Sequence, residues 1–303
     1  MWEVLVTSLK ATVPKAADAT LRMVGIKLLG KLLEIPEVWA DGYIQGKKDE
    51  IRAKSIFSDG LTTKALEAAT ENNALLQSVA DDLLETHWTR AKNKGQIFRK
   101  AVARIAASED ANFENAAVPN DDWMAAFGRL AEDISGDAMR ETFARILAGE
   151  VENPGSFSIS TLRIISGMNQ HVAAEFAEIC NELIGDCIFR RKKYSRGSDW
   201  LRMTMLRNEG LFSPVESSIH QPRGTNSWSV QTPKCWIEIE CTPDCASEIP
   251  IFNLTAAGLE IAMLLPEPDF EQNLRILVAE NEKKIGWKSV ILARHDGPIE
   301  KIQ

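Results

Sequence analysis

Residues 143–162 constrain the fold most, because they join the end of one amphipathic helix to the start of another through a dense turn. The apolar residues before the turn recur at helical spacing: Phe143, Ile146 and Leu147. Those after it do the same: Ile159, Leu162 and Ile165. Between them, Pro154-Gly155 is a dipeptide typical of tight turns. The stretch therefore predicts a helix–turn–helix unit whose two apolar faces must be covered by other parts of the chain.

The polar and small residues of the turn have specific expected roles. Gly149 is predicted to stop the first helix, because glycine adopts the left-handed conformation at little steric cost. Ser156, Ser158 or Ser160 is expected to cap the second helix. Glu150 is expected to accept hydrogen bonds there and brace the turn. The structural motif that we predict consists of Gly149, Glu150, Pro154, Gly155, Ser156, Ser158 and Thr161.

A carboxylate beside several serines also raises the question of catalysis. The motif itself contains no histidine, and His171 lies nine residues beyond it. A nucleophile needs a base and a group that orients the base, so an acyl-transfer triad is unsupported. We also find no Gly-rich phosphate loop, zinc-protease motif or nucleophile elbow. The sequence predicts a protein that is not an enzyme, with no catalytic residue, cofactor or metal.

The flanking segments predict a compact helical bundle over residues 121–189. Asp121 or Asp122 is expected to cap a helix with Trp123 and Phe127 on its apolar face. Ser135-Gly136-Asp137 then separates that helix from the one that leads into the turn.

The string from Leu147 to Leu162 reads LAGEVENPGSFSISTL. It resembles the signature LAGE-x-x-x-PGSFS-x-x-TL of a bacterial family of unknown function. That family looks related to the abortive-infection alpha proteins of phage defence. The resemblance is most specific in this string and extends more loosely over residues 120–265. It implies a cytoplasmic, often mobile-element-associated protein, and it carries over no catalytic residue.

Residues 1–120 predict a region of N-terminal helices. Residues 2–40 form a basic amphipathic segment, for which we favour packing on the protein over contact with a membrane surface. A basic group between Arg90 and Arg104 is interpreted as a solvated face rather than a phosphate site. Turn-forming residues at 107–121 predict a linker.

Residues 190–303 predict a smaller α+β module. Strands are expected at 227–231, 235–241, 249–254 and 287–293, because these runs are rich in β-formers or alternate in polarity. The order of a helix, Asn-Glu-Gly-Leu, a hairpin and Leu-Thr-x-x-Gly-x-Glu is similar to the wing portion of winged-helix domains. A basic cluster precedes it, and its members are candidate phosphate or partner contacts: Arg190, Arg191, Lys192, Lys193 and Arg196.

Composition narrows the classes of function. The net charge of -8 argues against a protein that coats nucleic acid nonspecifically. Five cysteines in 303 residues fit a reducing cytoplasm better than a disulfide framework. The spacing of Cys235, Cys241 and Cys245 is unlike that of zinc knuckles.

These observations predict a mainly α protein with N-terminal helices, a central helical bundle and a C-terminal winged-helix-like module. The expected function is a non-enzymatic, abortive-infection-like bacterial defence component that binds a protein partner or itself as a homo-oligomer. A winged-helix regulator that binds nucleic acid is the alternative. A membrane-acting toxin that uses residues 2–40 is a second and weaker alternative.

Overall fold

The computed structural model describes residues 73–107, 117–221, 224–242, 248–281, 287–295, 297 and 299–302. The chain divides into two compact units, Met1–Ser166 (unit 1) and Gly167–Gln303 (unit 2). This division falls inside the segment 121–189 that the sequence predicts as one bundle. The basic amphipathic segment 2–40, for which packing on the protein is predicted, and most of the predicted linker at 107–121 lie outside the described residues. None of the described helices is both long and apolar enough to cross a membrane.

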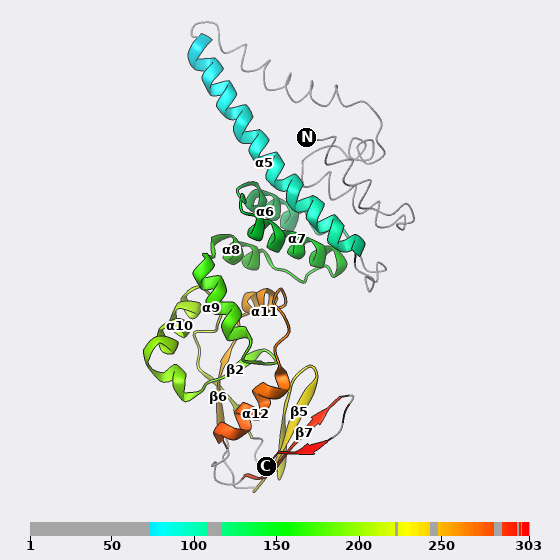
Figure 1. Ribbon diagram of the computed structural model, residues 1–303, viewed down its shortest axis with the longest axis vertical. Coiled ribbons are helices and arrows are strands. Elements are labelled where there is room, and N and C mark those ends of the chain that lie inside the picture. Colours follow the sequence, from blue (N-terminus) through cyan, green and yellow to red (C-terminus); the bar gives the residue numbers. More distant parts are fainter. Residues whose placement is uncertain are drawn as a thin grey trace. The chain divides into compact units, whose positions relative to one another are not determined.

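Helical residues far outnumber strand residues over the described part of the chain, which confirms a mainly α protein with a smaller α+β part (Figure 1). The described helices of unit 1 are α5 (Asn73–Ala107), α6 (Asp121–Glu132), α7 (Asp137–Glu152) and α8 (Ile159–Gly167). Those of unit 2 are α9 (Gln170–Cys180), the 3-10 helix η1 (Lys192–Ser195), α10 (Gly197–Asn208), α11 (Ala256–Ala262) and α12 (Phe270–Asn281). The strands, all in unit 2, are β1 (Leu183–Ile184), β2 (Cys187–Phe189), β3 (Ser217–His220), β4 (Ser227–Gln231), β5 (Cys235–Cys241), β6 (Glu248–Asn253), β7 (Trp287–Arg294) and β8 (Glu300–Lys301).

Unit 1 is a helical bundle in which the long helix α5 packs against α6 and α7. Phe98 of α5, Phe127 of α6 and Phe143 of α7 are completely buried. The Phe127 and Phe143 rings lie 5.4 Å apart between centroids, and Trp123 stacks on Phe127 at 5.0 Å. The apolar stripes predicted from helical spacing therefore form this core.

The basic group on α5 binds carboxylates on the two shorter helices. Lys94 Nζ donates to Glu132 at 2.7 Å, and Lys100 and Arg104 both bind Glu141, at 3.1 and 2.8 Å. These three cations are therefore engaged in interhelix ion pairs, where the sequence predicts a solvated face. Arg104 and Lys100 also hold the pKa of the Glu141 carboxyl below its usual range.

The helix boundary before Trp123 differs from the prediction by one residue. Asn120, and not Asp121 or Asp122, is the N-cap, and its side chain accepts from Trp123 N at 2.8 Å. The two aspartates occupy the first turn, where negative charge favours the helix dipole.

Unit 2 contains two four-stranded antiparallel sheets. The first has the strand order β1-β2-β6-β3 and the second the order β4-β5-β7-β8. All four strands predicted from the sequence are present. Strand β5 alternates as expected, with Ile237 and Ile239 buried and Glu238 and Glu240 exposed.

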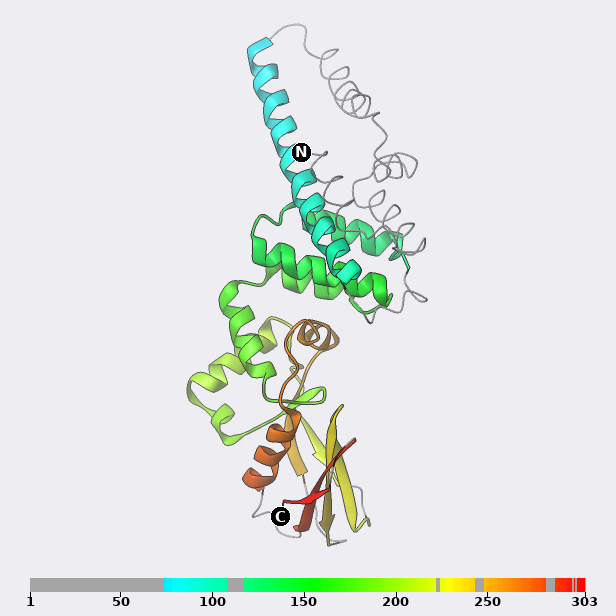
Figure 2. The same ribbon diagram turned by 45° about the vertical axis from the view of Figure 1, so that its right-hand side comes forward.

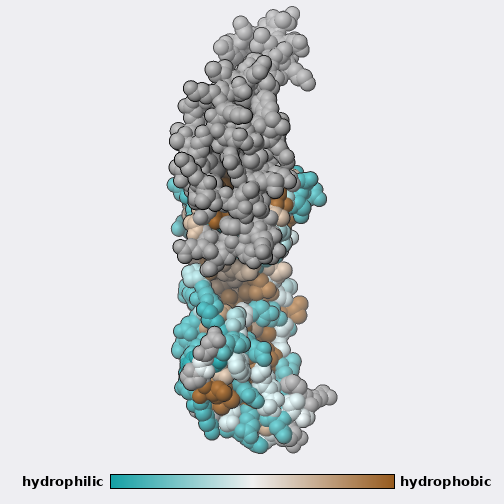
Figure 3. Space-filling view, turned by 90° about the vertical axis from the view of Figure 1, so that its right-hand side faces the viewer, coloured by the Kyte–Doolittle hydropathy of each residue, from teal (hydrophilic) through white to brown (hydrophobic). Residues whose placement is uncertain are grey.

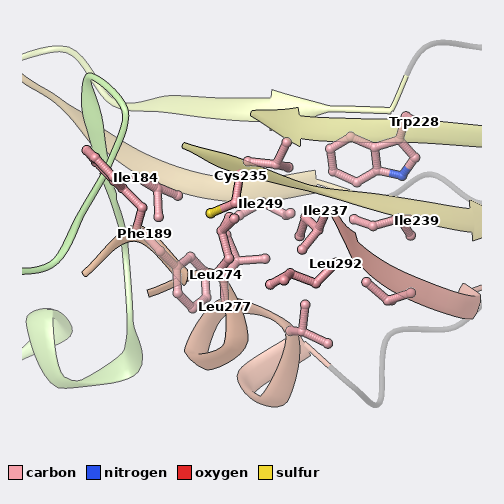
Figure 4. Close-up of a cluster of buried hydrophobic side chains, with 14 of the residues drawn as sticks. Ile184, Phe189, Trp228, Cys235, Ile237, Ile239, Ile249, Leu274, Leu277 and Leu292 are labelled. Carbon is pink, nitrogen blue, oxygen red and sulfur yellow. The ribbon is translucent and has the colours of Figure 1, made fainter. Parts of the chain in front are cut away.

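Both sheets and helix α12 share one hydrophobic core. Helix α12 lies beside the strands in the ribbon view (Figure 2). Its Leu274 and Leu277 lie in one cluster with Ile237 and Leu292 of the second sheet and Ile249 of the first (Figure 4). The core therefore joins elements that the sequence separates by more than ninety residues, from Ile184 to Leu292.

The strands of the region predicted as a wing belong to two different sheets. Strands β4 and β5 form a hairpin, but β5 pairs next with β7, while β3 pairs with β6. The expected hairpin therefore belongs to the second sheet, and the strand that leads into α11 belongs to the first. Hydrophobic burial explains the difference, because Val230, Ile237 and Ile239 face the core above α12.

The Asn-Glu-Gly-Leu motif at the end of α10 and the Leu-Thr-x-x-Gly-x-Glu motif at the start of α11 bind each other directly. Thr255 Oγ1 donates to the Gly210 carbonyl at 2.6 Å and accepts from Gly258 N at 3.0 Å, so Thr255 caps α11. A Cβ on Gly258 would lie 2.1 Å from the Leu211 carbonyl oxygen. Only glycine fits this approach between the end of α10 and the start of α11.

Candidate functional site

The turn between α7 and α8 has the pattern of a type II β-turn. Ser156 N donates to the Asn153 carbonyl at 3.2 Å across Pro154 and Gly155. Gly155 has a φ of 91°, and a type II turn requires a positive φ at this position after proline. The Pro-Gly dipeptide thus has the role that the sequence predicts.

Glu150 is buried and uses both carboxylate oxygens to hold the turn. Its Oε1 accepts from Gly155 N at 2.7 Å, and its Oε2 accepts from Phe157 N at 2.9 Å. Both donors are backbone N–H groups. The carboxylate is engaged on both oxygens by the chain itself, which agrees with the predicted bracing role.

Gly149 does not stop helix α7, which continues to Glu152. Its small size serves a different purpose, because a Cβ at this position would lie 2.9 Å from Cε2 of the Phe157 ring. The prediction of a left-handed stop was wrong, since the backbone here is helical and the constraint comes from the Phe157 side chain, eight residues away in sequence.

Phe157 is the link between the turn and the bundle core. Its ring packs on Gly149, its N–H binds Glu150, and its carbonyl accepts from Trp123 Nε1 at 2.6 Å. The sequence pattern did not single out Phe157, because one aromatic residue between serines has no periodicity.

Ser158 is the serine that caps α8. Thr161 N donates to Ser158 Oγ at 3.2 Å, and the Ser158 and Thr161 hydroxyls lie 3.0 Å apart. Ser156 Oγ instead donates to the Asn153 carbonyl at 2.6 Å within the turn. The polar side chains of the motif therefore bind its own backbone and one another, which is an arrangement that fixes conformation.

The basic cluster at 190–196 is largely neutralised by carboxylates. Arg190 binds Glu216 at 2.8 Å, and Arg191 binds Glu280 at 2.5 Å. Lys193 binds Glu182 at 2.5 Å. In the described part of the chain, Lys192 and Arg196 are exposed and form no ion pair. These two residues are the members of the predicted cluster that remain able to contact a charged partner.

Helix α10, which follows this cluster, has an exposed apolar face that the sequence pattern did not identify. Met203 and Leu206 are buried, whereas Trp200 and Leu201 are 49% and 62% exposed. The helix lies at the periphery of unit 2 in both ribbon views (Figures 1 and 2). No local signal marked Trp200 as exposed, because Trp200 and the buried Met203 are three residues apart, a spacing that places both side chains on one face of a helix.

The four described cysteines are buried, and none of them is in a disulfide: Cys180, Cys187, Cys235 and Cys241. Burial raises the pKa of Cys180 and of Cys187 to about 12. These two thiols are therefore protonated at neutral pH and poor nucleophiles. Among the residues that the structure describes, no group of three or more potential ligands is placed to hold a metal ion.

Comparison with known proteins adds one family match. A family model described as a protein of unknown function (DUF2806) matches residues 86–184, from the second half of α5 to β1. The matched span includes the turn and its Glu150 brace. No curated protein matches the chain, and no solved structure does.

Proposed function

We propose that this protein is a non-enzymatic, abortive-infection-like defence component that acts by self-association through helix α10. The observation that carries the proposal is the exposed Trp200–Leu201 face described above. Large exposed apolar side chains are costly to leave in water, and tryptophan is enriched among residues that dominate binding energy at interfaces. On the face of unit 2 drawn in Figure 3, apolar patches likewise interrupt a hydrophilic surface.

A second copy of the chain is the partner that the charges of α10 favour. Arg196 precedes the N-terminus of the helix and Glu209 follows its C-terminus, and both are exposed. Each charge opposes the dipole of its own helix, which prefers an anion at the N-terminus and a cation at the C-terminus. An antiparallel copy of α10 would place each charge against its opposite.

The apolar residues fit the same arrangement. A two-fold axis midway between Arg196 and Glu209 places Trp200 opposite Met205 of the second copy and Leu201 opposite Thr204. The charged ends of the pair are separated by about 20 Å along the helix, at 1.5 Å per residue. Such a contact is self-complementary, as a two-fold interface must be. One short helix pair buries little area, so we expect a dissociation constant in the micromolar range or weaker.

Charge reversal tests the pairing. We expect sedimentation equilibrium to show a mass that rises with concentration in the wild-type protein. Arg196→Glu and Glu209→Arg should each weaken the association, and the double variant should restore it, because each new charge meets its opposite on the other copy. Arg145→Glu, an exposed change in unit 1, is the matched control. A monomer at all concentrations, or no restoration, contradicts the proposal.

Phage plating tests the defence role separately. The resemblance of the Leu147–Leu162 string to a defence-related family motivates this part of the proposal. Cells that express the wild-type protein should reduce plating, and Trp200→Ala should remove the reduction. Unchanged plating with a protein that still self-associates would reject the defence role and keep the interface.

The alternative is a winged-helix protein that binds nucleic acid. It is favoured by the Gly210–Thr255 connection between α10 and α11, which brings the two wing-like motifs together, and by the two unpaired cations Lys192 and Arg196. Against it, the other cations of the cluster are paired and Glu238 is exposed on the β4–β5 hairpin. Salt-dependent binding to duplex DNA that is lost in Lys192→Ala/Arg196→Ala would support it, and no binding at low salt would reject it.

A further inference from the structure

The second sheet of unit 2 carries a cavity on the face that points away from α12. Its volume is about 210 Å³, and it is lined by Gln231, Trp236 and His295. The register explains why these residues meet, because Trp236 on β5 pairs with Gln231 on β4 and with Ala293 on β7. His295 follows Ala293 by two positions, so its side chain returns to the same face. The cavity is therefore built by cross-strand neighbours on a rigid element.

Two aromatic rings form its walls. The Trp236 and His295 ring centroids lie 5.2 Å apart at an interplanar angle of 51°. Two tilted rings leave an open corner that admits a flat group against the tryptophan face. Tryptophan is also the aromatic side chain that attracts cations most strongly through its ring.

The charges around the cavity favour a cation. Glu238 lies two residues beyond Trp236 on the same face of β5, about 7 Å away at the rise of an antiparallel strand. Its side chain is exposed and forms no ion pair with any described residue. The nearest cations along the chain are engaged elsewhere, Lys234 with Glu267 and Arg294 with Glu271.

Lys301 is a further described cation on this face. It pairs with Ile291, which in turn pairs with Glu238, so it lies two strands from the carboxylate. At about 4.8 Å per strand this is roughly 10 Å, a separation at which exposed charges are largely screened at physiological salt. Among the described residues, Glu238 is therefore the charged side chain without an ion pair that lies nearest Trp236 along β5.

We propose that this cavity binds a guanidinium group, either of an arginine side chain or of a small free molecule. The planar cation stacks on Trp236, donates to the side-chain amide oxygen of Gln231 and directs its remaining donors toward Glu238. A guanidinium carries five N–H donors in one plane, which suits an aromatic face flanked by two acceptors. Ligands that carry phosphate are disfavoured by the carboxylate. This site is separate from the α10 surface and does not depend on self-association.

The indole N–H resonances of protein with ¹⁵N-labelled tryptophan provide the test. The chain has eight tryptophans, and the Trp236 signal is identified by its loss in Trp236→Leu. We expect it to shift saturably with acetylarginine amide and not with acetylcitrulline amide, a neutral molecule of the same shape. Agmatine in place of acetylarginine amide distinguishes a free guanidinium from one flanked by peptide groups. Affinity should be millimolar, as for a single charged group on an exposed ring.

Substitution of the carboxylate gives the second readout. Glu238→Gln should weaken binding about fivefold, the change that corresponds to ~1 kcal/mol. Glu85→Gln, an exposed change on α5 with the same loss of charge, should leave it unchanged. Because Glu238 is exposed, its substitution does not threaten folding, and the seven other indole signals report on that directly. The proposal is overturned by any of three results. These are equal shifts with acetylcitrulline amide, equal binding of acetylarginine amide by Glu238→Gln, or no shift with acetylarginine amide at tens of millimolar.

Discussion

Replacement of Glu150 by glutamine is the sharpest test of the turn between α7 and α8. The substitution keeps the shape of the side chain, but it removes the charge and turns one acceptor oxygen into an NH₂ donor. In the native turn, the two oxygens accept from Gly155 N at 2.7 Å and Phe157 N at 2.9 Å. One of these backbone N–H groups would therefore face another donor, inside a site where Glu150 is 3% exposed.

The magnitude follows from these contacts. Loss of one hydrogen bond to a charged acceptor costs about 1.5–3 kcal/mol, and a buried donor left without an acceptor costs about 1–3 kcal/mol. Part of the first quantity is offset, because a buried carboxylate near the C-terminus of α7 is itself costly to desolvate and opposes the helix dipole. We therefore expect the free energy of unfolding of unit 1 to fall by about 2–4 kcal/mol, which lowers its Tm on the order of 10 °C.

Urea denaturation measures the free energy of unfolding, and hydrogen exchange measures the protection of the backbone amides that Glu150 binds. The Gly155 and Phe157 amides should be protected in the wild-type protein and exchange faster in Glu150→Gln. Glu152→Gln is the matched control on the same helix. Desolvation raises the pKa of Glu152, so the folded state disfavours its charge at neutral pH and the control should be neutral or slightly stabilising. A Glu150→Gln variant within about 0.5 kcal/mol of wild type, the usual range of a surface substitution, would refute the bracing role.

Three further predictions are also tested by urea denaturation. Gly149→Ala should destabilise unit 1 by about 1–3 kcal/mol, because its Cβ would lie 2.9 Å from the Phe157 ring. Gly258→Ala should be more severe in unit 2, because its Cβ would lie 2.1 Å from a backbone carbonyl oxygen that cannot move aside like a ring; equal effects would contradict this reasoning. Acid should destabilise unit 2, because the Arg294 guanidinium holds the pKa of Glu271 below its usual range. Because the pKa of Glu271 is lower in the folded state, its ionised form stabilises the protein at pH values above the unfolded-state pKa. That stability is lost as the pH falls through the folded-state pKa. Arg294→Gln should therefore make the free energy of unfolding depend less on pH below about 4.3.

Local pattern predicted most elements of the chain. Strand β5 could be found because Trp236-Ile237-Glu238-Ile239-Glu240 alternates strictly, and alternation has one physical cause, a strand buried on one face. The helices of unit 1 could be found because their apolar residues recur at helical spacing. Cap positions were less certain, as the shift from Asp121 to Asn120 shows, because neighbouring residues of similar chemistry compete for the same role.

The candidate sites depended on contacts that no local pattern contains. The role of Glu150 was predicted because acceptor and turn are adjacent in sequence. The exposed Trp200 could not be distinguished from a core residue until the packing of α10 was known. The cavity at Trp236 and His295 joins residues fifty-nine positions apart, and only strand pairing brings them together.

The sequence by itself determined the helices of the bundle, the position of the tight turn at Pro154-Gly155 and the strands of unit 2, because each depends on steric limits or burial periods that act within a few residues. Tertiary structure decided which strands pair, why Gly149 and Gly258 must be glycine, and which cations remain exposed. These properties depend on atoms outside the local helix or strand. The glycines show this directly, because the atom that excludes a Cβ lies beyond the glycine's own helix: it belongs to Phe157 for Gly149 and to Leu211 for Gly258.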